Sequence, residues 1–335
     1  MLVAGGFRDT NLATAEIWDP ATGLFTATAN NLSAARGYAT STVLVGGKVL
    51  IAGGGDYNDG GAASAAAEIF DPATGMFTAT TSPMNAARHG ATATLLNSGK
   101  VLVAGGIASN SQARLATAEL YDPATNTFSY TGSMHAARDV ASAVKLPNGN
   151  VLICGGGDGT GVSLDSSEIY IATGTGAGTF TVGATMKAKR DDATATLLPG
   201  GLVLIVGGIN NDVPIGSAEL YDYNANTFTL SKSSITPRHF HTANLLASGQ
   251  VLIAGGVDGA TNIGTLKDAQ LYDPPTDMFL TTGAMVTARY YHTATLLQDG
   301  RVLVAGGYND AGVVETAEIY GEAGDQIFAN GFDVP

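Results

Sequence analysis

The chain repeats one short apolar stretch that ends in two glycines. Val302-Leu303-Val304-Ala305-Gly306-Gly307 is one copy, and the chain opens on another at residues 2–6. The remaining copies occupy residues 49–54, 101–106, 151–156, 203–208 and 251–256. Each copy predicts a short buried strand that stops abruptly, because glycine pairs rarely continue a strand. An internal repeat of this kind predicts a repeat architecture before any other signal is considered.

A second strand precedes most copies and begins after an arginine. These arginines recur about every fifty residues, a repeat-length spacing, at Arg36, Arg88, Arg138, Arg190, Arg238 and Arg289. A strand such as residues 292–297 follows, and then a turn such as Asp299-Gly300. An Asp-Gly pair supplies the positive φ angles of a tight hairpin. The two strands are therefore predicted to form a hairpin.

Two further strands complete each repeat. The third has the pattern Ala-Glu-Ile/Leu-Tyr, as at residues 317–320, and leads to an Asp-Pro-Ala-Thr-Gly turn at residues 19–23 and 71–75. Asx, Pro and Gly at those places are typical of a β-turn. The fourth strand begins with an aromatic residue, at Phe25, Phe77, Phe128, Phe180, Phe228 and Phe279. Four antiparallel strands per repeat are expected.

This combination of Gly-Gly, Glu-x-Tyr-Asp-Pro, an aromatic and an arginine resembles the kelch repeat. The resemblance covers residues 1–320, although phenylalanine stands where the repeat usually has tryptophan. It implies an all-β fold, a β-propeller of four-stranded blades. We expect one propeller domain over residues 1–335, with blades near residues 1–34, 36–86, 88–136, 138–188, 190–236, 238–287 and 289–335.

Seven strands of the second and third kinds predict seven blades, with Phe328 in the last fourth strand. Only six arginine-led strands are present, so the first blade is expected to lack its innermost strand. We expect that strand, and any export signal, to precede Met1. The alternative is a six-bladed ring with a spare partial blade, which would leave an apolar edge unpaired.

The charge and hydrophobicity of the chain limit the classes of partner that it can bind. The 16 Lys and Arg residues against 29 Asp and Glu give a net charge of −13. Nucleic acid is not expected as a partner because it requires a basic stripe. No apolar run approaches the roughly 20 residues of a membrane span, so membrane insertion is not expected. Low Lys with abundant Thr, Ala and Gly is typical of an exported bacterial protein, which predicts an extracellular or cell-surface location.

The charged residues shared by all blades are predicted to be structural. The six arginines and the third-strand glutamates recur in blade after blade, whereas a catalytic site is normally unique; we expect blade-to-blade ion pairs. Gln270 replaces glutamate once, and we expect a neutral hydrogen bond there. Cys154 replaces the alanine of the opening stretch and is expected to be a small buried residue.

Binding residues are expected where the copies differ, in loops on one face. The kelch resemblance points to the residues just after the arginine and just after Gly-Gly, near the channel mouth. Aromatic residues gather there in the last two and first two blades and predict a ligand-binding arc. Its residues are Phe7, Tyr38, Tyr57, His239, Phe240, Tyr290, Tyr291 and Tyr308.

Two groups of residues are weaker candidates for metal binding. His241 and His292 occupy equivalent positions in adjacent blades and could hold Zn²⁺ or Cu²⁺. The carboxylates of Asp139, Asp191 and Asp192 could hold Ca²⁺. The alternatives are packing histidines and a solvated acidic patch. We otherwise expect no cofactor.

Three functions remain open at this point. The first is a secreted or surface binding module that recognises a glycan or an extended polypeptide. The second is a structural, self-assembling or adhesive surface protein, with the first blade completed by another strand. The third is a kelch-type enzyme acting on a sugar, an oxidase or an isomerase. Kelch propellers of bacteria resemble the central domain of galactose oxidase, a copper-radical enzyme that uses a Tyr crosslinked to Cys, a second Tyr and two His. That comparison fails at Cys154, which is predicted to lie in a core strand.

Overall fold

A computed structural model describes residues 1–8, 10–56, 62–108, 113–172, 178–259, 264–321 and 326–330. All of its regular elements are β-strands, and they form two compact units. Unit 1 comprises residues 1–162 and 167–183, and unit 2 comprises residues 163–166 and 184–335. No described helix is present that could cross a membrane.

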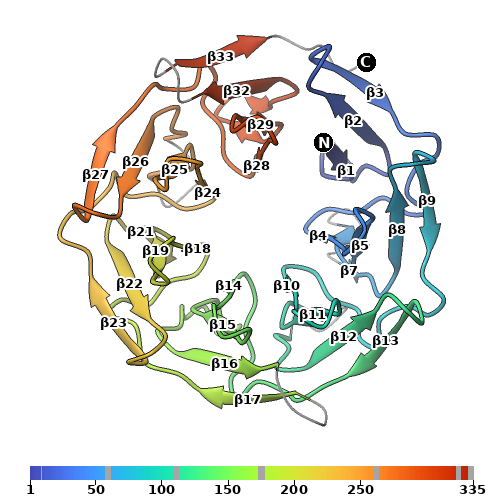
Figure 1. Ribbon diagram of the computed structural model, residues 1–335, viewed down its shortest axis with the longest axis horizontal. Helices are drawn as coiled ribbons and strands as arrows, with labels where there is room; N and C mark the ends of the chain where they lie inside the picture. The colour runs from blue at the N-terminus through green and yellow to red at the C-terminus, as the bar shows by residue number, and fades with distance from the viewer. Residues whose placement is uncertain are drawn as a thin grey trace. The chain divides into compact units, whose positions relative to one another are not determined.

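Unit 1 contains four blade sheets, whose strands run in chain order from the first to the last (Figure 1). Blade 1 has only three strands: β1 (Leu2–Ala4), β2 (Ala15–Asp19) and β3 (Leu24–Ala27). Blade 2 contains β4 (Thr40–Val43), β5 (Val49–Ala52), β8 (Ala67–Asp71) and β9 (Met76–Ala79). Blade 3 contains β10 (Thr92–Leu95), β11 (Val101–Ala104), β12 (Ala118–Asp122) and β13 (Thr127–Tyr130). Blade 4 contains β14 (Ser142–Lys145), β15 (Val151–Cys154), β16 (Ser167–Ile171) and β17 (Thr179–Val182).

Unit 2 contains three blade sheets of four strands each. Blade 5 contains β18 (Thr194–Leu197), β19 (Val203–Val206), β22 (Ala218–Asp222) and β23 (Thr227–Leu230). Blade 6 contains β24 (Thr242–Leu245), β25 (Val251–Ala254), β26 (Ala269–Asp273) and β27 (Met278–Thr281). Blade 7 contains β28 (Thr293–Leu296), β29 (Val302–Ala305), β32 (Ala317–Gly321) and β33 (Gln326–Asn330).

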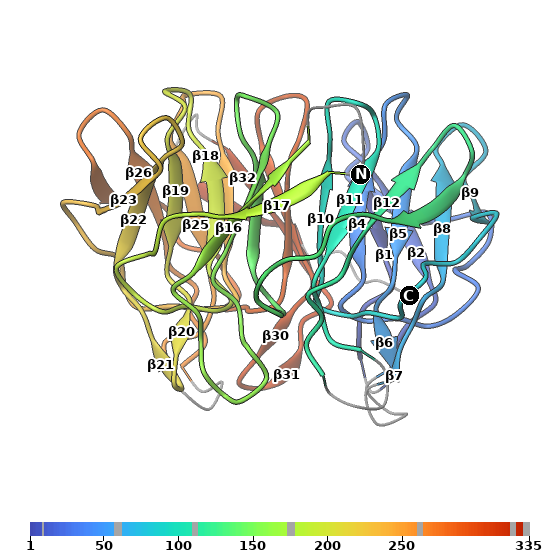
Figure 2. The same cartoon turned by 90° about the horizontal axis from the view of Figure 1, so that it is seen from below.

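The loops after Gly-Gly carry three short hairpins. They are β6 (Gly55–Asp56) with β7 (Ala62–Ala63), β20 (Ile209–Asn210) with β21 (Val213–Pro214), and β30 (Tyr308–Asn309) with β31 (Gly312–Val313). In unit 2, both hairpins extend from the same side of the blades (Figure 2). These loops therefore extend beyond the blade sheets, where the copies of the repeat differ most.

The sheets confirm the predicted fold class: the chain is an all-β, seven-bladed β-propeller, and the six-bladed alternative is wrong. The three-stranded blade 1 confirms that its innermost strand is not among the described strands. All blade pairings are antiparallel, as in the register Val101↔Tyr121 and Tyr121↔Phe128. Phe328 lies in the last fourth strand, but one place off that register, because Ile327 is the residue opposite Tyr320.

The core lies between neighbouring blades. Leu50 and Ala52 of blade 2 pack with Val101, Val103 and Phe128 of blade 3, and all five are less than a tenth exposed. The continuous apolar stretch is explained by this packing, since strand two is covered on both faces and has no polar side. Phe128 fills the space between blades, as predicted.

The Gly-Gly pair is required by a close backbone approach. Gly105 and Gly106 have φ angles of 70° and 93°, which favour glycine. The Gly106 amide donates to the carbonyl of Arg138, which begins the next blade, at 2.9 Å. A Cβ atom on Gly106 would lie 2.7 Å from the carbonyl oxygen of His89. The motif that ends the strand therefore also joins consecutive blades.

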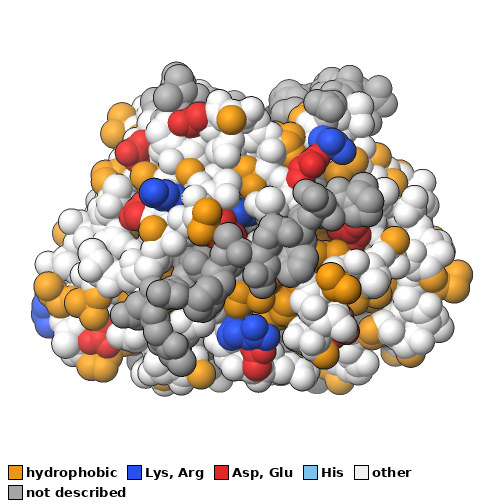
Figure 3. Space-filling model, turned by 90° about the horizontal axis from the view of Figure 1, so that it is seen from above, with side chains coloured by type: hydrophobic (Ala, Val, Ile, Leu, Met, Phe, Trp, Pro, Cys, Tyr) orange, Lys and Arg blue, Asp and Glu red, His pale blue; other side chains and the backbone are white. Residues whose placement is uncertain are grey.

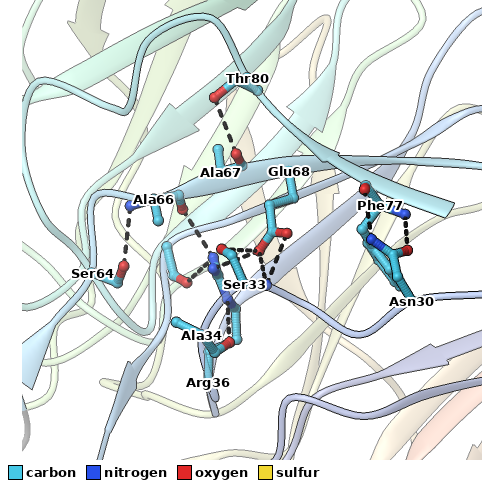
Figure 4. Close-up of polar contacts among 11 residues, drawn as sticks. Asn30, Ser33, Ala34, Arg36, Ser64, Ala66, Ala67, Glu68, Phe77 and Thr80 are labelled. Carbon is cyan, nitrogen blue, oxygen red and sulfur yellow. Dashed lines mark hydrogen bonds and ion pairs between the residues drawn. The ribbon is translucent and has the colours of Figure 1, made fainter.

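Five of the six arginine-led segments are held by a buried arginine–glutamate ion pair. Arg36 donates through Nη1 to the carbonyls of Gly53 and Ala66, and through Nη2 to Glu68 at 2.8 Å (Figure 4). The side chains of Arg36 and Glu68 are 1% and 4% exposed. Arg88–Glu119, Arg138–Glu168, Arg190–Glu219 and Arg289–Glu318 repeat the arrangement. The predicted structural pairs exist, but each lies within one blade and not between two blades.

The glutamate of each pair also connects two blades, because its carboxylate accepts further hydrogen bonds from the segment that follows the preceding blade. Glu68 also accepts from the backbone amide and the hydroxyl of Ser33, which follows the last strand of blade 1. Glu119 likewise accepts from the amides of Asn85 and Ala86. Each buried carboxylate is therefore satisfied by an arginine and by backbone donors, as a buried charge must be.

Candidate functional site

The two variable positions identified from the repeats lie side by side in each of blades 2 to 7. The residue after the arginine forms a β-bridge with the residue after Gly-Gly, as in Asp139↔Gly157, His239↔Val257 and Tyr290↔Tyr308. In the Tyr290–Tyr308 bridge both amides donate, each over 2.9 Å. The strands that the blades share therefore hold two variable residues next to each other, one after the arginine and one after Gly-Gly.

The second residue after each arginine has a left-handed backbone in every complete blade. These residues are Tyr38 (φ 52°), Gly90 (61°), Val140 (42°), Asp192 (50°), Phe240 (55°) and Tyr291 (54°). A positive φ is uncommon outside glycine, and for a β-branched residue such as Val140 it is an outlier. The conformation is not evident from the sequence, because Gly90 and Asp192 are the only two of these six residues whose types favour a positive φ.

Backbone hydrogen bonds connect these left-handed residues along each unit. In unit 1, the Gly90 amide donates to Tyr38 O at 3.2 Å and the Val140 amide donates to Gly90 O at 2.9 Å. In unit 2, the Tyr291 amide donates to Phe240 O at 3.2 Å. The conformation is over-determined by the surrounding backbone, which is how such strain persists at functional positions.

Four of the eight predicted binding residues form one aromatic cluster in unit 2. The Phe240 ring lies 3.9 Å from the Tyr291 ring and 6.3 Å from the Tyr290 ring, between centroids. Tyr290 contacts the rings of Tyr291 at 5.4 Å and Tyr308 at 5.9 Å. We call Phe240, Tyr290, Tyr291 and Tyr308 the aromatic cluster. The interplanar angles of 31° to 48° are tilted arrangements, which aromatic pairs favour over a face-to-face sandwich.

The cluster has an exposed side and a buried support. Tyr291 is 37% exposed, whereas His239 is only 1% exposed and its ring lies 4.2 Å from the Phe240 ring. Burial and the nearby Asp310 carboxylate raise the pKa of Tyr290, so its hydroxyl stays protonated. Asp310 itself accepts from the Thr265 hydroxyl and amide, which contribute to its lowered pKa. The cluster therefore offers neutral rings with a phenol donor and a carboxylate acceptor close by.

Three of the other predicted binding residues belong to unit 1 or lie outside the described residues. Phe7 and Tyr38 belong to unit 1, where Tyr38 is 39% exposed. Tyr57 lies outside the described residues.

The candidate metal ligands have other partners. The Asp139 carboxylate is buried and pairs with Arg114 at 3.0 Å, and Asp191 accepts from the Ser163 hydroxyl at 3.3 Å. Asp192 is the left-handed residue of blade 5. Among the residues that the structure describes, no three His, Cys, Asp or Glu side chains come close enough to share a metal ion. Calcium at the acidic positions stays a prediction.

His241 and His292 lie in the blade interfaces. Their Nε2 atoms are hydrogen-bonded to the hydroxyls of Thr194 and Thr242, in the preceding blades, at 3.0 and 2.9 Å. Both histidines are 6% exposed. Burial lowers the pKa of His292 to about 3 and that of His241 far below its usual range. Their geometry is that of neutral packing residues.

The comparisons with known proteins agree with this geometry. Residues 87–135 match the family model described as the Kelch motif, and they contain the Arg88 segment, Gly-Gly, the Glu119 strand and the Phe128 strand. This chain is a kelch-repeat β-propeller. Among curated proteins, none matches the sequence significantly.

A solved structure with the same fold is a fungal alcohol oxidase of the AA5 family, in complex with copper. It is 19% identical to this kelch propeller over 92% of this chain and 67% of its own, with a TM-score of 0.74. At that identity the likeness shows the fold alone.

Copper does not fit the described residues of this kelch propeller. Cys154 is the only cysteine of the chain, and it is 2% exposed within β15, paired with Ser142 and Ser167 on the flanking strands. His241 and His292, at equivalent positions in adjacent blades, already have their Nε2 atoms hydrogen-bonded to threonine hydroxyls. The prediction that Cys154 lies in a core strand is confirmed, and we derive no redox step for this protein.

Proposed function

We propose that this kelch propeller is a glycan-binding module whose contact surface is the aromatic cluster of unit 2. The observation that carries the proposal is the contact among the four aromatic rings of the cluster. Two of the four residues, Phe240 and Tyr291, have a left-handed backbone. Strained positions occupied by large rings are costly for folding, which favours a functional reason for their presence.

The chemistry of the cluster suits a carbohydrate. Tyr and Phe provide a large contact area with few rotatable bonds, and a sugar ring presents C–H groups to an aromatic face. The Tyr290 hydroxyl and the Asp310 carboxylate can orient sugar hydroxyls, as a few placed polar groups do in ligand sites. The side of the protein drawn in Figure 3 has few charged side chains, and hydrophobic atoms are scattered among polar ones. The rings of the aromatic cluster are neutral, and the net charge of −13 disfavours a polyanionic ligand.

The test is a glycan array followed by titration calorimetry on the best ligand. Tyr291→Asn removes the exposed ring and keeps a residue type that tolerates positive φ. We expect at least tenfold weaker binding, the effect of losing a central anchor residue, with folding retained. Tyr130→Asn is the matched control, because Tyr130 is 56% exposed on β13, in the other unit.

Two results would contradict the proposal. One is an array without any ligand, and the other is a ligand whose affinity is the same for Tyr291→Asn and the wild type. Selective binding of an extended peptide at the cluster would replace the glycan with a polypeptide partner. An extracellular or cell-surface location stays a prediction that such a ligand would favour.

A further inference from the structure

The aromatic cluster of unit 2 has a fixed carboxylate beside it. Asp310 follows Tyr308 by two residues, in the turn that joins β30 to β31. Its Oδ1 atom accepts from the amide and the hydroxyl of Thr265, in the loop of the preceding blade. Thr265 in turn forms a β-bridge with Val257. Because one loop supplies the carboxylate and the neighbouring loop holds it, its position is set before any ligand binds.

This carboxylate is charged and acts on the rings. The hydrogen bond from the Thr265 hydroxyl is the main cause that lowers the pKa of Asp310, so the group is ionised at neutral pH. After burial, which is the larger cause, the Asp310 charge raises the pKa of Tyr290. Asp310 is exposed, and a carboxylate has about four acceptor positions, more than Thr265 occupies. A ligand that contacts the rings therefore has a negative charge within reach.

The loops around the cluster supply no positive charge. The segments after Gly-Gly in unit 2, residues 207–217, 255–266 and 306–316, contain three aspartates, one glutamate and no Lys or Arg. Arg238 and Arg289 precede the variable positions of the cluster, but their side chains are fully buried and paired with carboxylates. A ligand at the cluster therefore meets aromatic faces and carboxylates, in loops without a cationic side chain.

Aromatic faces and a carboxylate together favour a cation. The face of a Tyr or Phe ring is the negative side of its quadrupole, and it attracts an ammonium group within about 6 Å of the ring centroid. The centroids of Phe240 and Tyr291 are 3.9 Å apart, and those of Tyr290 and Tyr308 are 5.9 Å apart. A cation at one ring of the cluster is therefore close to a second ring. A neutral hydroxyl gains only a hydrogen bond at the same place.

We propose, on the basis of the glycan-binding function above, that the aromatic cluster binds amino sugars, with the protonated amine paired with the Asp310 carboxylate and the sugar ring packed on Tyr291. A neutral sugar makes the same ring contact without the ion pair, so it binds more weakly. A sugar acid brings a second negative charge next to Asp310, and this repulsion selects against it.

The test is titration calorimetry of the full chain with two oligosaccharides of equal length, a glucosamine oligomer and its N-acetylated form, at a pH that keeps the amine protonated. We expect the glucosamine oligomer to bind at least fivefold more tightly, since acetylation removes both the ion pair and the attraction of the ring faces for a cation. Added salt should reduce this preference. Asp310→Asn should weaken binding of the glucosamine oligomer about threefold and change that of the N-acetylated form by less than about twofold.

The matched control is Asp212→Asn. Asp212 is an exposed aspartate of unit 2 in the turn between β20 and β21, and its φ is 61°, a conformation that asparagine also tolerates. The substitution removes the same charge from the same unit, but blade 5 supplies no residue to the aromatic cluster. It should therefore change the affinity for the glucosamine oligomer by less than about twofold.

Three results would overturn the proposal. Equal affinity for the two oligomers would show that the charge of the amine is not recognised. An equal loss with Asp212→Asn and Asp310→Asn would show that the total charge of the unit, and not Asp310, attracts the ligand. Binding of neither oligomer is the third. In each case, another glycan that binds the wild type and not Tyr291→Asn would leave the glycan-binding function intact, whereas an array without any ligand would remove both.

Discussion

At the scale of single residues, the left-handed positions are places where the fold imposes a backbone conformation that costs stability. Val140 has a φ of 42° although its side chain is β-branched, and Gly90 occupies the equivalent position without strain. Non-glycine residues in this region cost on the order of 1–3 kcal/mol. We expect Val140→Gly to raise the free energy of unfolding by about 1 kcal/mol, because relief of strain exceeds the loss of partial burial and the entropy of the added glycine. Denaturant unfolding would measure it.

The matched control at this scale is Val144→Gly, in the ordinary strand β14. Glycine there removes a packed side chain and gains no relief, so that variant should be less stable than the wild type. Equal destabilisation by both variants would show that the φ of Val140 is not a source of strain.

At the scale of the strand, the positive charge of Arg238 in blade 6 is neutralised by a different residue from the one used in the other blades. Gln270 replaces the usual glutamate, and the Gln270 amide oxygen accepts from Arg238 at 3.3 Å. The predicted neutral hydrogen bond is present, but Arg238 also pairs with Asp268 at 2.5 Å. The copies at the Asp268 position are neutral, namely Ala66, Thr117, Ser166, Ser217 and Thr316. The negative charge has moved two residues toward the N-terminus, to the residue just before β26.

This shift predicts a strong coupling between two positions. Asp268→Thr leaves the Arg238 guanidinium, which is 0% exposed, without a carboxylate, and should cost about 3 kcal/mol. Adding Gln270→Glu restores the arrangement of the other blades and should recover most of that loss. A double-mutant cycle by denaturant unfolding measures the coupling. Additive effects of the two changes would refute it.

The same strands show what the sequence can and cannot predict. The seven blades, the Arg36–Glu68 type of pair and the buried Cys154 follow from residues that recur at fixed places. The role of Asp268 does not, because it appears in one copy only. The positive φ of Tyr291 could not be predicted either, since tyrosine does not favour that conformation and the surrounding backbone imposes it. The aromatic cluster was predicted as residues, but contact among the rings of Phe240, Tyr290 and Tyr291 required the fold.

At the scale of the whole molecule, the buried histidines link global stability to pH. Burial first, and the charge of Arg289 second, lower the pKa of His292 to about 3, although an interaction of the ring with the Arg289 backbone carbonyl opposes them. The unfolded chain binds a proton near pH 6.5 and the folded chain does not until near pH 3. Stability therefore falls as the pH drops through that window and is insensitive to this group above it.

His292→Ala should flatten this dependence, because alanine occupies the equivalent place at Ala39, Ala91, Ala141 and Ala193. Between pH 7 and pH 4.5, the wild type should lose about 2.5 kcal/mol more stability than the variant, at roughly 1.4 kcal/mol per pH unit over two units. The variant should have a lower free energy of unfolding at pH 7, since Thr242 loses its hydrogen-bond partner.

Carboxylates such as Glu168, whose pKa is lowered by backbone donors in spite of burial, titrate in both proteins, so their effect cancels in the difference between wild type and variant. If the units unfold in separate steps, the difference belongs to the transition of unit 2, which contains His292. Parallel stability curves would mean that His292 is protonated in the folded protein.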